Sequence, residues 1–466
     1  MPRRGTPACP AAGTNRLVAW TARCGIVGRP VVPMVVHSLA ARVEGQASRR
    51  GLIPRVPTGD RLLADVEAWL TTNHPDLVRS VQQSTPGEGE ARLEVSLHPA
   101  ATPLVLTASD AGRVGAEADT VAVGPGYHRL VGRILERMEM DLAVEWGRVH
   151  PDRLDEPDEA AAATFSDRVA TERAYLGWLG RMLVGARAAR AAGGPPIQVG
   201  APAGVKFTFD GVIATALGPR DDAWLERAIA DTRVAIDVTP WWADATDAQS
   251  MLNRALCLMW LDVRWRPPAL KPEGLVLDEV HRLLSRAFPL DPSLAYPWRA
   301  WAEVVALRSI SDPMARQVVS RAMRERDGGV EIGYRRAPVT ISHEGWALTV
   351  PGSFAEKRSA EEWWGGGTGR AITLAAVQTG TDEGAMSAHA FIEQFGGDMG
   401  PDAIDHRAGG VMGRATLASD ATSGVEVGIL EGFSAVVGSG AVIRIEFDDP
   451  ADWQWAIDIW KSLAPG

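Results

Sequence analysis

The sequence is poor in cysteine, in lysine and in long apolar runs, and these shortages narrow the class of protein. Three cysteines, Cys9, Cys24 and Cys257, show no C-x-x-C spacing and are too few for a disulfide framework, which favours a reducing compartment. The absence of any run of about 18 apolar residues excludes a protein built of membrane-spanning helices. Lysine supplies only four of the 48 basic residues, an arginine bias typical of a bacterium with a GC-rich genome.

The composition that remains is that of a globular protein with an uneven charge. The chain has 466 residues, of which 46% are hydrophobic and 23% charged. At roughly 150 residues per domain, this length predicts about three domains. The formal net charge of −10 argues against a nucleic-acid partner. Residues 339–466 hold 18 acidic and 7 basic side chains, so nearly all of the net acidity lies in the C-terminal quarter.

Residues 1–33 differ from the rest, because they contain five arginines, five prolines and no acidic residue. The apolar stretches are too short and too broken for a secretory signal, so we expect a disordered basic arm and a cytoplasmic protein. An over-extended start codon, with translation beginning at Met34, is the alternative to a genuine arm that touches an anionic partner.

Residues 34–150 combine strand and helix patterns. Polar and apolar residues alternate at 91–97 and 103–107, and residues 114–123 offer one or two further strands. Helical spacing of apolar residues occurs at 61–70 and 130–138. We therefore predict a small α+β domain, a sheet with a helix on each side in sequence.

A glycine turn, G-P-G-Y-H, precedes the second of these helices. Such a turn can offer backbone N–H groups to an anion, and Gly124, Gly126, His128 and Arg129 are the candidate residues. Because Arg129 occupies the sixth position of G-x-G-x-x-G, the turn is not a dinucleotide fingerprint. The favoured interpretation is a strand-to-helix turn in which Tyr127 and His128 pack on the sheet.

Residues 151–338 are predicted to be mainly helical, after an acidic, alanine-rich linker at 151–165. The expected helices are 167–192, a segment from 221, 251–261, 274–287, 294–309 and 312–325. Residues 205–209 alternate like an isolated strand or extended loop. The segment 251–261 is apolar on most faces and should be the buried central helix.

Tryptophans stand out in this helical region. Trp298 and Trp301 are three residues apart and are expected to wedge between helices. Trp241 and Trp242 lie in a proline-flanked loop and are the candidates for an exposed aromatic contact with a partner. The spacing of acidic residues and His281 favours a solvated helix face, so no metal site is predicted.

Residues 339–466 give strands, a helix, a strand meander and a last helix, which predicts an α+β sandwich and makes the whole chain a multidomain α+β protein. The expected elements are strands at 339–342, 346–354, 371–377, 411–418, 425–431, 433–437 and 441–447, a helix at 385–394, and a last helix with Trp453, Ile457 and Trp460 on one face.

Three parts of this segment resemble the PsbP-like superfold. They are W-A-L-T-V-P-G-S-F from Trp346 to Phe354, the central strand–helix pair, and W-A-I-D-I-W-K-S-L from Trp455 to Leu463. The superfold is shared by the photosystem II extrinsic protein, a Ran-binding nuclear import factor and many bacterial lipoproteins. The resemblance covers about residues 339–464 and implies a non-catalytic binding or assembly module. No functional residue of the superfold can be assigned to a position of this sequence.

Two loops of this segment also have candidate functions. The G-G-G-T-G-R run from Gly365 to Arg370 lacks the Lys-Ser/Thr of a P-loop, so a flexible hairpin tip is favoured over a phosphate cradle. Asp398, Asp402 and Asp405 lie in a glycine-rich loop without the spacing of a calcium site. A solvated acidic loop is favoured, and the three aspartates are candidate contacts for a basic partner.

The sequence contains no G-x-S-x-G, H-E-x-x-H or P-loop motif, so it nominates no catalytic residue and no cofactor. The favoured hypothesis is a bacterial, cytoplasmic protein-interaction or assembly module that docks a basic protein, such as a toxin or secretion component, through its acidic C-terminal domain. The alternative is a hydrolase or transferase with a site near His128 and Arg129, between the first two domains. The oligomeric state is left open.

Overall fold

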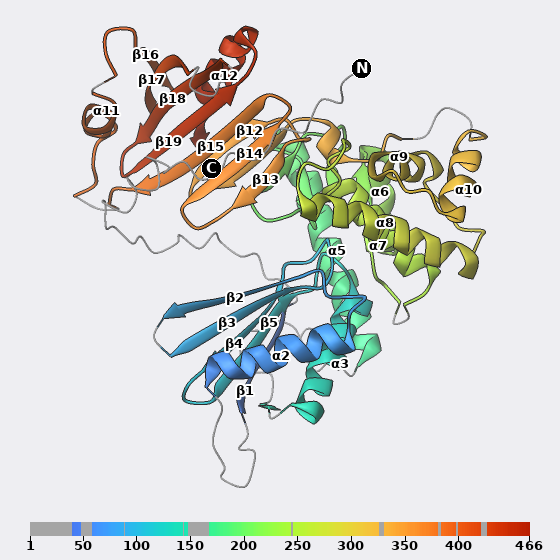
Figure 1. Ribbon diagram of the computed structural model, residues 1–466. Helices are drawn as coiled ribbons and strands as arrows, with labels where there is room; N and C mark the ends of the chain where they lie inside the picture. Colours follow the sequence, from blue (N-terminus) through green and yellow to red (C-terminus); the bar gives the residue numbers. More distant parts are fainter. Residues whose placement is uncertain are drawn as a thin grey trace. The chain divides into compact units, whose positions relative to one another are not determined.

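The computed structural model consists of two compact units, an N-terminal unit within Met34–Ala337 and a C-terminal unit from Pro338 to Gly466. The structure describes residues 40–47, 58–87, 89–142, 144–147, 167–243, 246–325, 330–380, 384–397, 399–420 and 426–466. The predicted arm at 1–33 and linker at 151–165 lie outside these residues. Several antiparallel sheets and many helices confirm a multidomain α+β protein (Figure 1). None of the described helices combines the length and the apolar character needed to cross a bilayer.

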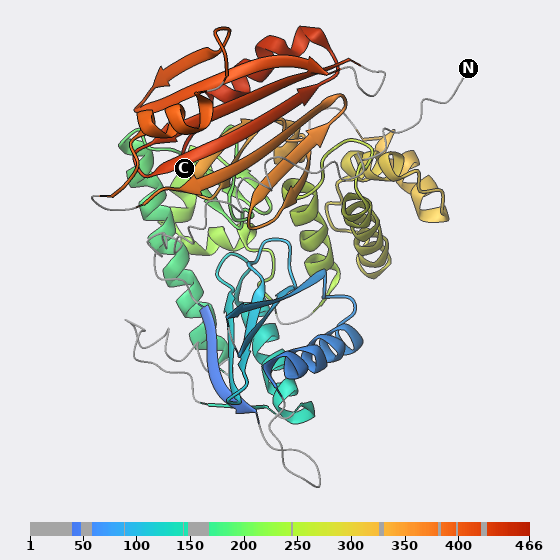
Figure 2. The same ribbon diagram turned by 60° about the vertical axis from the view of Figure 1, so that its left-hand side comes forward.

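The N-terminal unit begins with a six-stranded antiparallel sheet. Its strands, in order across the sheet, are β2 (Ser80–Gly87), β3 (Glu90–Ser96), β4 (Leu104–Ser109), β5 (Arg113–Asp119), β1 (Ala40–Ala47) and β6 (Val144–Trp146). Leu93 and Leu106 are register partners and both are buried, as the alternation of polar and apolar residues predicts. Helices α2 (Gly59–Asn73) and α3 (Pro125–Asp141) cover this buried face (Figure 2).

The rest of the N-terminal unit is mainly helical. Its helices are α5 (Arg168–Ala191), α6 (Asp222–Ala230), α7 (Ala248–Leu261), α8 (Lys271–Leu290), α9 (Trp298–Arg308) and α10 (Pro313–Ala322), with 3-10 turns η2 (Thr232–Val238) and η3 (Tyr334–Arg336). Four of the helices begin after an aspartate whose carboxylate accepts an amide hydrogen bond from the first turn. These aspartates are Asp167, Asp221, Asp247 and Asp312.

Helix α7 is the central helix of this part, as its apolar sequence predicts, and most of its side chains are buried. Trp298 and Trp301 of α9 stack with ring centroids 5.4 Å apart. The Trp301 indole N–H donates to Nδ1 of His281 on α8 at 3.0 Å. The two tryptophans therefore pack between helices.

Short strands complete the N-terminal unit. β7 (Ile197–Val199), β9 (Ile213–Thr215) and β10 (Gly218–Arg220) form a small sheet in which β7 and β9 are parallel. β8 (Val205–Phe207) falls in the segment that the sequence predicts to be extended.

The C-terminal unit is built on a seven-stranded antiparallel sheet. Its strands, in order, are β13 (Ala355–Arg358), β14 (Glu362–Gly367), β15 (Arg370–Gln378), β19 (Ser439–Phe447), β18 (Val427–Val436), β17 (Val411–Asp420) and β16 (Ile404–Ala408). A hairpin, β11 (Val339–His343) with β12 (Trp346–Val350), also pairs with β20 (Ala464–Pro465). The helices are α11 (Ala388–Gly396), η4 (Pro450–Asp452) and α12 (Trp453–Lys461).

Two details of this sheet differ from the expectation. Residues 427–436 form one strand, β18, where the sequence predicts two short ones, because the chain stays in register with β17 and β19 throughout. The glycines Gly365, Gly366 and Gly367 belong to β14, so only Thr368 and Gly369 form the tip of the hairpin to β15.

The two helices pack on opposite faces of the sheet. Trp460 of α12 lies against Gly432, where a Cβ atom would meet the indole ring at 2.8 Å. Phe391 of α11 lies against Gly440 of β19, where a Cβ atom would meet its ring at 2.1 Å. Helix α11 packs with Val377 and Ala435 at one end of its face, while Arg444 and Glu431 of the same face remain partly or fully exposed.

Candidate functional sites

The glycine turn at the start of α3 is enclosed by the segment that contains Trp241. Gly124 precedes the helix with a φ of 123°, a conformation that favours glycine. The amide of Gly126 donates to the Trp241 carbonyl at 3.1 Å. A Cβ atom on Gly126 would lie 2.1 Å from the Ala243 carbonyl oxygen. An amide that the predicted anion site would use is therefore bonded within the protein.

The two side chains proposed for the same site are also buried. His128 is 1% exposed, and its Nδ1 lies 2.8 Å from the hydroxyl of Thr120. The hydroxyl of Tyr175 on α5 donates to the same Thr120 oxygen at 2.7 Å. Arg129 is 5% exposed. The structure brings the four residues together, but the surroundings of His128 give the alternative enzyme hypothesis no support.

Trp241 is 3% exposed and packs inside the N-terminal unit, not at its surface as the loop sequence suggests. Its ring lies 6.3 Å from that of Tyr127 and 6.2 Å from that of His98. The bond from Gly126 and this aromatic cluster draw the loop inward. Trp242 is partly exposed and packs beside Tyr175.

The aspartates proposed as contacts in the C-terminal unit have different environments. Asp398 lies outside the described residues. Asp402 and Asp405 are both exposed. Arg414 donates to Asp405 at 2.7 Å, and this hydrogen bond holds the pKa of the Asp405 carboxyl below its usual value. Within the described ranges, no group of three or more His, Cys, Asp or Glu side chains could hold a metal ion.

An ionic network that the sequence did not suggest joins the first sheet to the helices. Arg254 of α7 donates to Glu279 of α8 at 2.7 Å. Arg79, next to β2, donates to Asp262 at 2.7 Å and lies 3.6 Å from Glu279. Burial of the two arginines disfavours their charged forms, and removing one partner of such a pair leaves an uncompensated charge.

The two arginines respond oppositely to this environment. Burial lowers the pKa of Arg254, and nearby Arg79 lowers it further, against the opposing effect of Glu279. Burial also lowers the pKa of Arg79, but Asp262 and Glu279 outweigh it and the net shift is upward. The available sequence signal was Arg254 itself, a charged residue inside the otherwise apolar segment 251–261.

Two other titratable side chains near the network are held neutral. His98 is 2% exposed and accepts a hydrogen bond from the Ala100 amide at 3.2 Å. Burial, with the charges of Arg254 and Arg79, holds the pKa of His98 well below its usual range. Cys257 is fully buried, and burial raises the pKa of its thiol, which makes it an unreactive residue.

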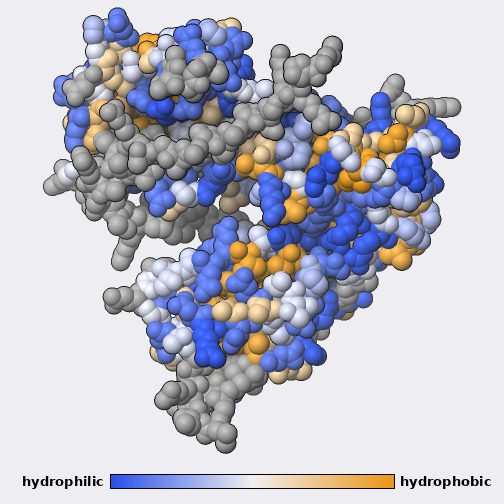
Figure 3. Space-filling model, viewed as in Figure 1, coloured by the Kyte–Doolittle hydropathy of each residue, from blue (hydrophilic) through white to orange (hydrophobic). Residues whose placement is uncertain are grey.

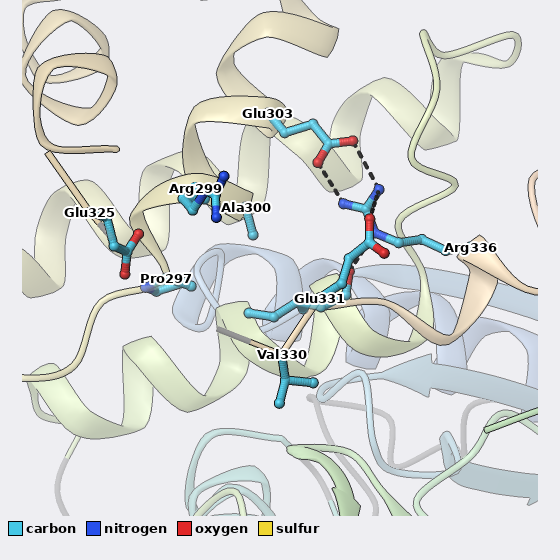
Figure 4. Close-up of a pocket in the computed structure, with 9 residues that line it drawn as sticks. Pro297, Arg299, Ala300, Glu303, Glu325, Val330, Glu331 and Arg336 are labelled. Atoms are coloured by element: carbon cyan, nitrogen blue, oxygen red, sulfur yellow. Dashed lines mark hydrogen bonds and ion pairs between the residues drawn. The ribbon is translucent and has the colours of Figure 1, made fainter. Parts of the chain in front are cut away.

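A hollow of about 370 Å³ lies beside helix α9 (Figure 4). Arg336 donates to Glu303 at 3.1 Å, lies 3.2 Å from Glu331, and covers the Trp265 ring at 3.8 Å. The described lining holds Pro, Arg, Ala, Glu, Val and Ile, and no Ser, Cys, Lys or His side chain. Its charges largely neutralise each other.

The C-terminal unit carries acidic residues at one end of its sheet. Strand β17 ends at Asp420, which is the register partner of Val427 at the start of β18. Glu426 precedes β18, and Asp448 and Asp449 follow β19. All four side chains are exposed, and we call them the acidic strand-end cluster. On the side shown in Figure 3, the coloured surface of this unit is mostly hydrophilic.

Arginines of this sheet are engaged in ion pairs within the unit. Arg370, at the same end of the sheet, donates to Asp452 at 2.6 Å, and this bond raises the pKa of the guanidinium. Arg444 donates to both Glu431 and Glu446 at 2.8 Å. The charge of Asp449 also raises the pKa of Arg370, so this arginine offsets part of the cluster's negative charge.

The fold thus defines a multidomain α+β protein, and comparisons with known proteins add no closer classification. No protein-family model and no curated protein matches the chain. A crystal structure from Bacteroides thetaiotaomicron VPI-5482 is similar over 26% of this chain and 46% of its own, with 7% sequence identity and a TM-score of 0.22. A likeness this weak carries no argument.

Proposed function

We propose that this protein is a non-catalytic binding or assembly protein whose C-terminal unit docks a basic partner protein. The observation that carries the proposal is the acidic strand-end cluster, in which Asp420, Glu426, Asp448 and Asp449 stand exposed at the ends of three adjacent strands. Like charges so arranged create a potential that steers a basic partner and speeds its association.

The uncovered part of the sheet face supports docking at the same end. Helix α11 covers only the other end of this face. Glu431 and Glu446 lie on the open part and share one arginine, Arg444. A basic segment laid over this surface would meet more carboxylates than guanidinium groups.

The remaining elements of the proposal rest on the sequence. The resemblance of residues 339–464 to the PsbP-like superfold implies a binding or assembly role. The scarcity of cysteine favours a reducing compartment, and the arginine bias favours a bacterium, so a bacterial cytoplasm is the proposed place of action. A toxin or a secretion component with a basic surface is the kind of partner that fits.

The test measures binding of a fluorescent lysine-rich peptide to the full chain by anisotropy, over about 50–300 mM salt. The variant carries Asp420→Asn, Glu426→Gln, Asp448→Asn and Asp449→Asn. We expect its affinity to fall about tenfold, since four partly screened charges contribute about 0.3–0.5 kcal/mol each. Wild-type affinity should fall as the salt concentration rises.

A matched control removes the same charge elsewhere on the unit. It carries changes at four other exposed acidic residues, Glu344→Gln, Glu361→Gln, Glu393→Gln and Asp458→Asn. We expect this control to bind within about twofold of the wild type if the cluster is the docking site. An equal loss of affinity in both variants, or a wild-type affinity that does not change with salt concentration, would overturn the proposal.

A further inference from the structure

A second surface of the molecule gathers positive charge, and it lies in the N-terminal unit. The loop between α2 and β2, the helices α7 and α8, and the segment after Thr239 meet around a hollow of about 50 Å³. Asp76, Trp241, Ser250, Arg254, Arg282 and Arg286 are among its lining residues. We call it the arginine pocket.

Two buried N–H groups of residues that line this pocket lack an acceptor. The Nε of Arg254 and the indole N–H of Trp241 have no hydrogen-bond partner in the described part of the chain. Arg254 has 6% of its side chain exposed and Trp241 is 3% exposed. Buried donors are almost always bonded, and both of these N–H groups are closed to water, so a ligand reaches them only if the pocket rearranges.

The outer side of the pocket is closed by a weak internal contact. Arg282 donates to one carboxylate oxygen of Asp76 at 2.9 Å, and Arg286 donates to the other at 3.0 Å. The Asp76 side chain is 62% exposed, so these ion pairs are screened by water and contribute little to stability. A competing anion could displace the Asp76 carboxylate at small cost.

We propose that the arginine pocket binds a phosphate group, which displaces Asp76 and accepts the hydrogen bonds that Arg282 and Arg286 now donate to its carboxylate, while the charge of Arg254 lies beside them. The pocket has room for about three to five water-sized groups, which matches a phosphate. Guanidinium forks match phosphate oxygens in geometry as well as in charge.

The charge and donor count favour phosphate over a carboxylate. Around the pocket, Arg79, Arg254, Arg282 and Arg286 face Glu279 and Asp262 once Asp76 has moved, which leaves a charge of +2. A phosphate monoester carries about −1.5 to −2 at neutral pH. At least four donors then converge, and phosphate offers more acceptor oxygens than a carboxylate does.

The test is equilibrium dialysis of the full chain against radiolabelled inorganic phosphate, at an ionic strength held constant with chloride. Arg286→Gln and Arg282→Gln are expected to weaken binding at least about tenfold, because each removes a charge-assisted hydrogen bond. Asp76→Asn is expected to tighten binding severalfold, because it removes the competing charge. Opposite effects at the two ends of one ion pair would not arise if the contact were merely structural.

Controls and competitors separate the alternatives. Arg308→Gln breaks an exposed pair between α9 and Asp278 of α8, neither of which lines the pocket, and should leave phosphate binding unchanged. Acetate should compete more weakly than phosphate. Competition by phenyl phosphate assigns the pocket to a phosphate group of a larger molecule, and its exclusion assigns the pocket to free phosphate.

Three results would overturn the proposal: no saturable phosphate binding, binding that Arg286→Gln leaves intact, or acetate that competes as well as phosphate. The site does not depend on the acidic strand-end cluster. Either proposal can therefore fail while the other stands.

Discussion

At the scale of single residues, the chemistry of this protein depends on which charged side chains find partners when they are buried. Arg254 lies in an apolar helix and is matched by Glu279, while its Nε has no acceptor among the described residues. His128, which the sequence suggested for an anion site, is instead hydrogen-bonded to Thr120 in the interior. Residue type alone therefore did not indicate which group is available to a ligand.

Replacing Glu279 should lower the stability of the N-terminal unit, because the buried arginines lose their shared partner. Glu279→Met leaves Arg254 and Arg79 without their shared carboxylate, so we expect the free energy of unfolding to fall by about 3 kcal/mol or more. Urea unfolding followed by tryptophan fluorescence measures the loss. The neighbouring change Asp278→Asn breaks only an exposed pair and should cost less than about 1 kcal/mol.

The double variant Glu279→Met with Arg254→Met sharpens this test. It should recover part of the lost stability, because an apolar pair replaces the uncompensated charge. A double variant less stable than Glu279→Met alone would show that Arg254 stabilises the unit through contacts other than Glu279.

At the scale of elements, patterned segments were predictable and weakly patterned ones were not. The apolar spacing located α2 and α7 to within a few residues, and the predicted helix at 312–325 overlaps α10. Strand β1 was missed because Val43 is its only large apolar residue and because its stability comes from pairing with β5 and β6. The glycine run of β14 was missed because glycine favours turns when no tertiary contact is known.

At this scale, we predict that a side chain added at a glycine packed against α11 destabilises the C-terminal unit. Gly440→Ala would place a Cβ atom 2.1 Å from Phe391, so we expect the C-terminal unit to lose about 1–3 kcal/mol of stability in urea unfolding. Gly384→Ala is the control, since no atom lies within 4 Å of its added Cβ. Adding Phe391→Leu to Gly440→Ala should restore part of the loss, and no restoration would argue against the steric cause.

At the scale of the whole molecule, each unit buries a histidine that resists protonation. Burial lowers the pKa of His98 in the N-terminal unit, with Arg254 and Arg79 adding to it. Burial likewise lowers the pKa of His343 in the C-terminal unit. In both cases the unfolded chain binds a proton more readily than the folded one, so stability is highest above the unfolded pKa of about 6.5.

We therefore expect stability to fall as the pH drops below about 6.5 towards the lower folded pKa values, by up to about 1.4 kcal/mol per pH unit for each histidine. Urea unfolding at pH 7.5, 6.5 and 5.5 measures this slope. His343→Gln should flatten the slope for the C-terminal unit only. A stability that rises between pH 7.5 and 5.5 would contradict the assignment.

The sequence by itself determined the α+β class, most helices, the central position of α7 and the concentration of acidic charge in residues 339–466. These features follow from local periodicity, capping and composition, which involve residues close together in the chain. Only the tertiary structure decided that Trp241 is buried, that Asp76 meets Arg282 and Arg286, and that acidic residues of three strands share one end of a sheet. Those contacts join residues up to about 210 positions apart, and the packing that brings them together leaves no local pattern to detect.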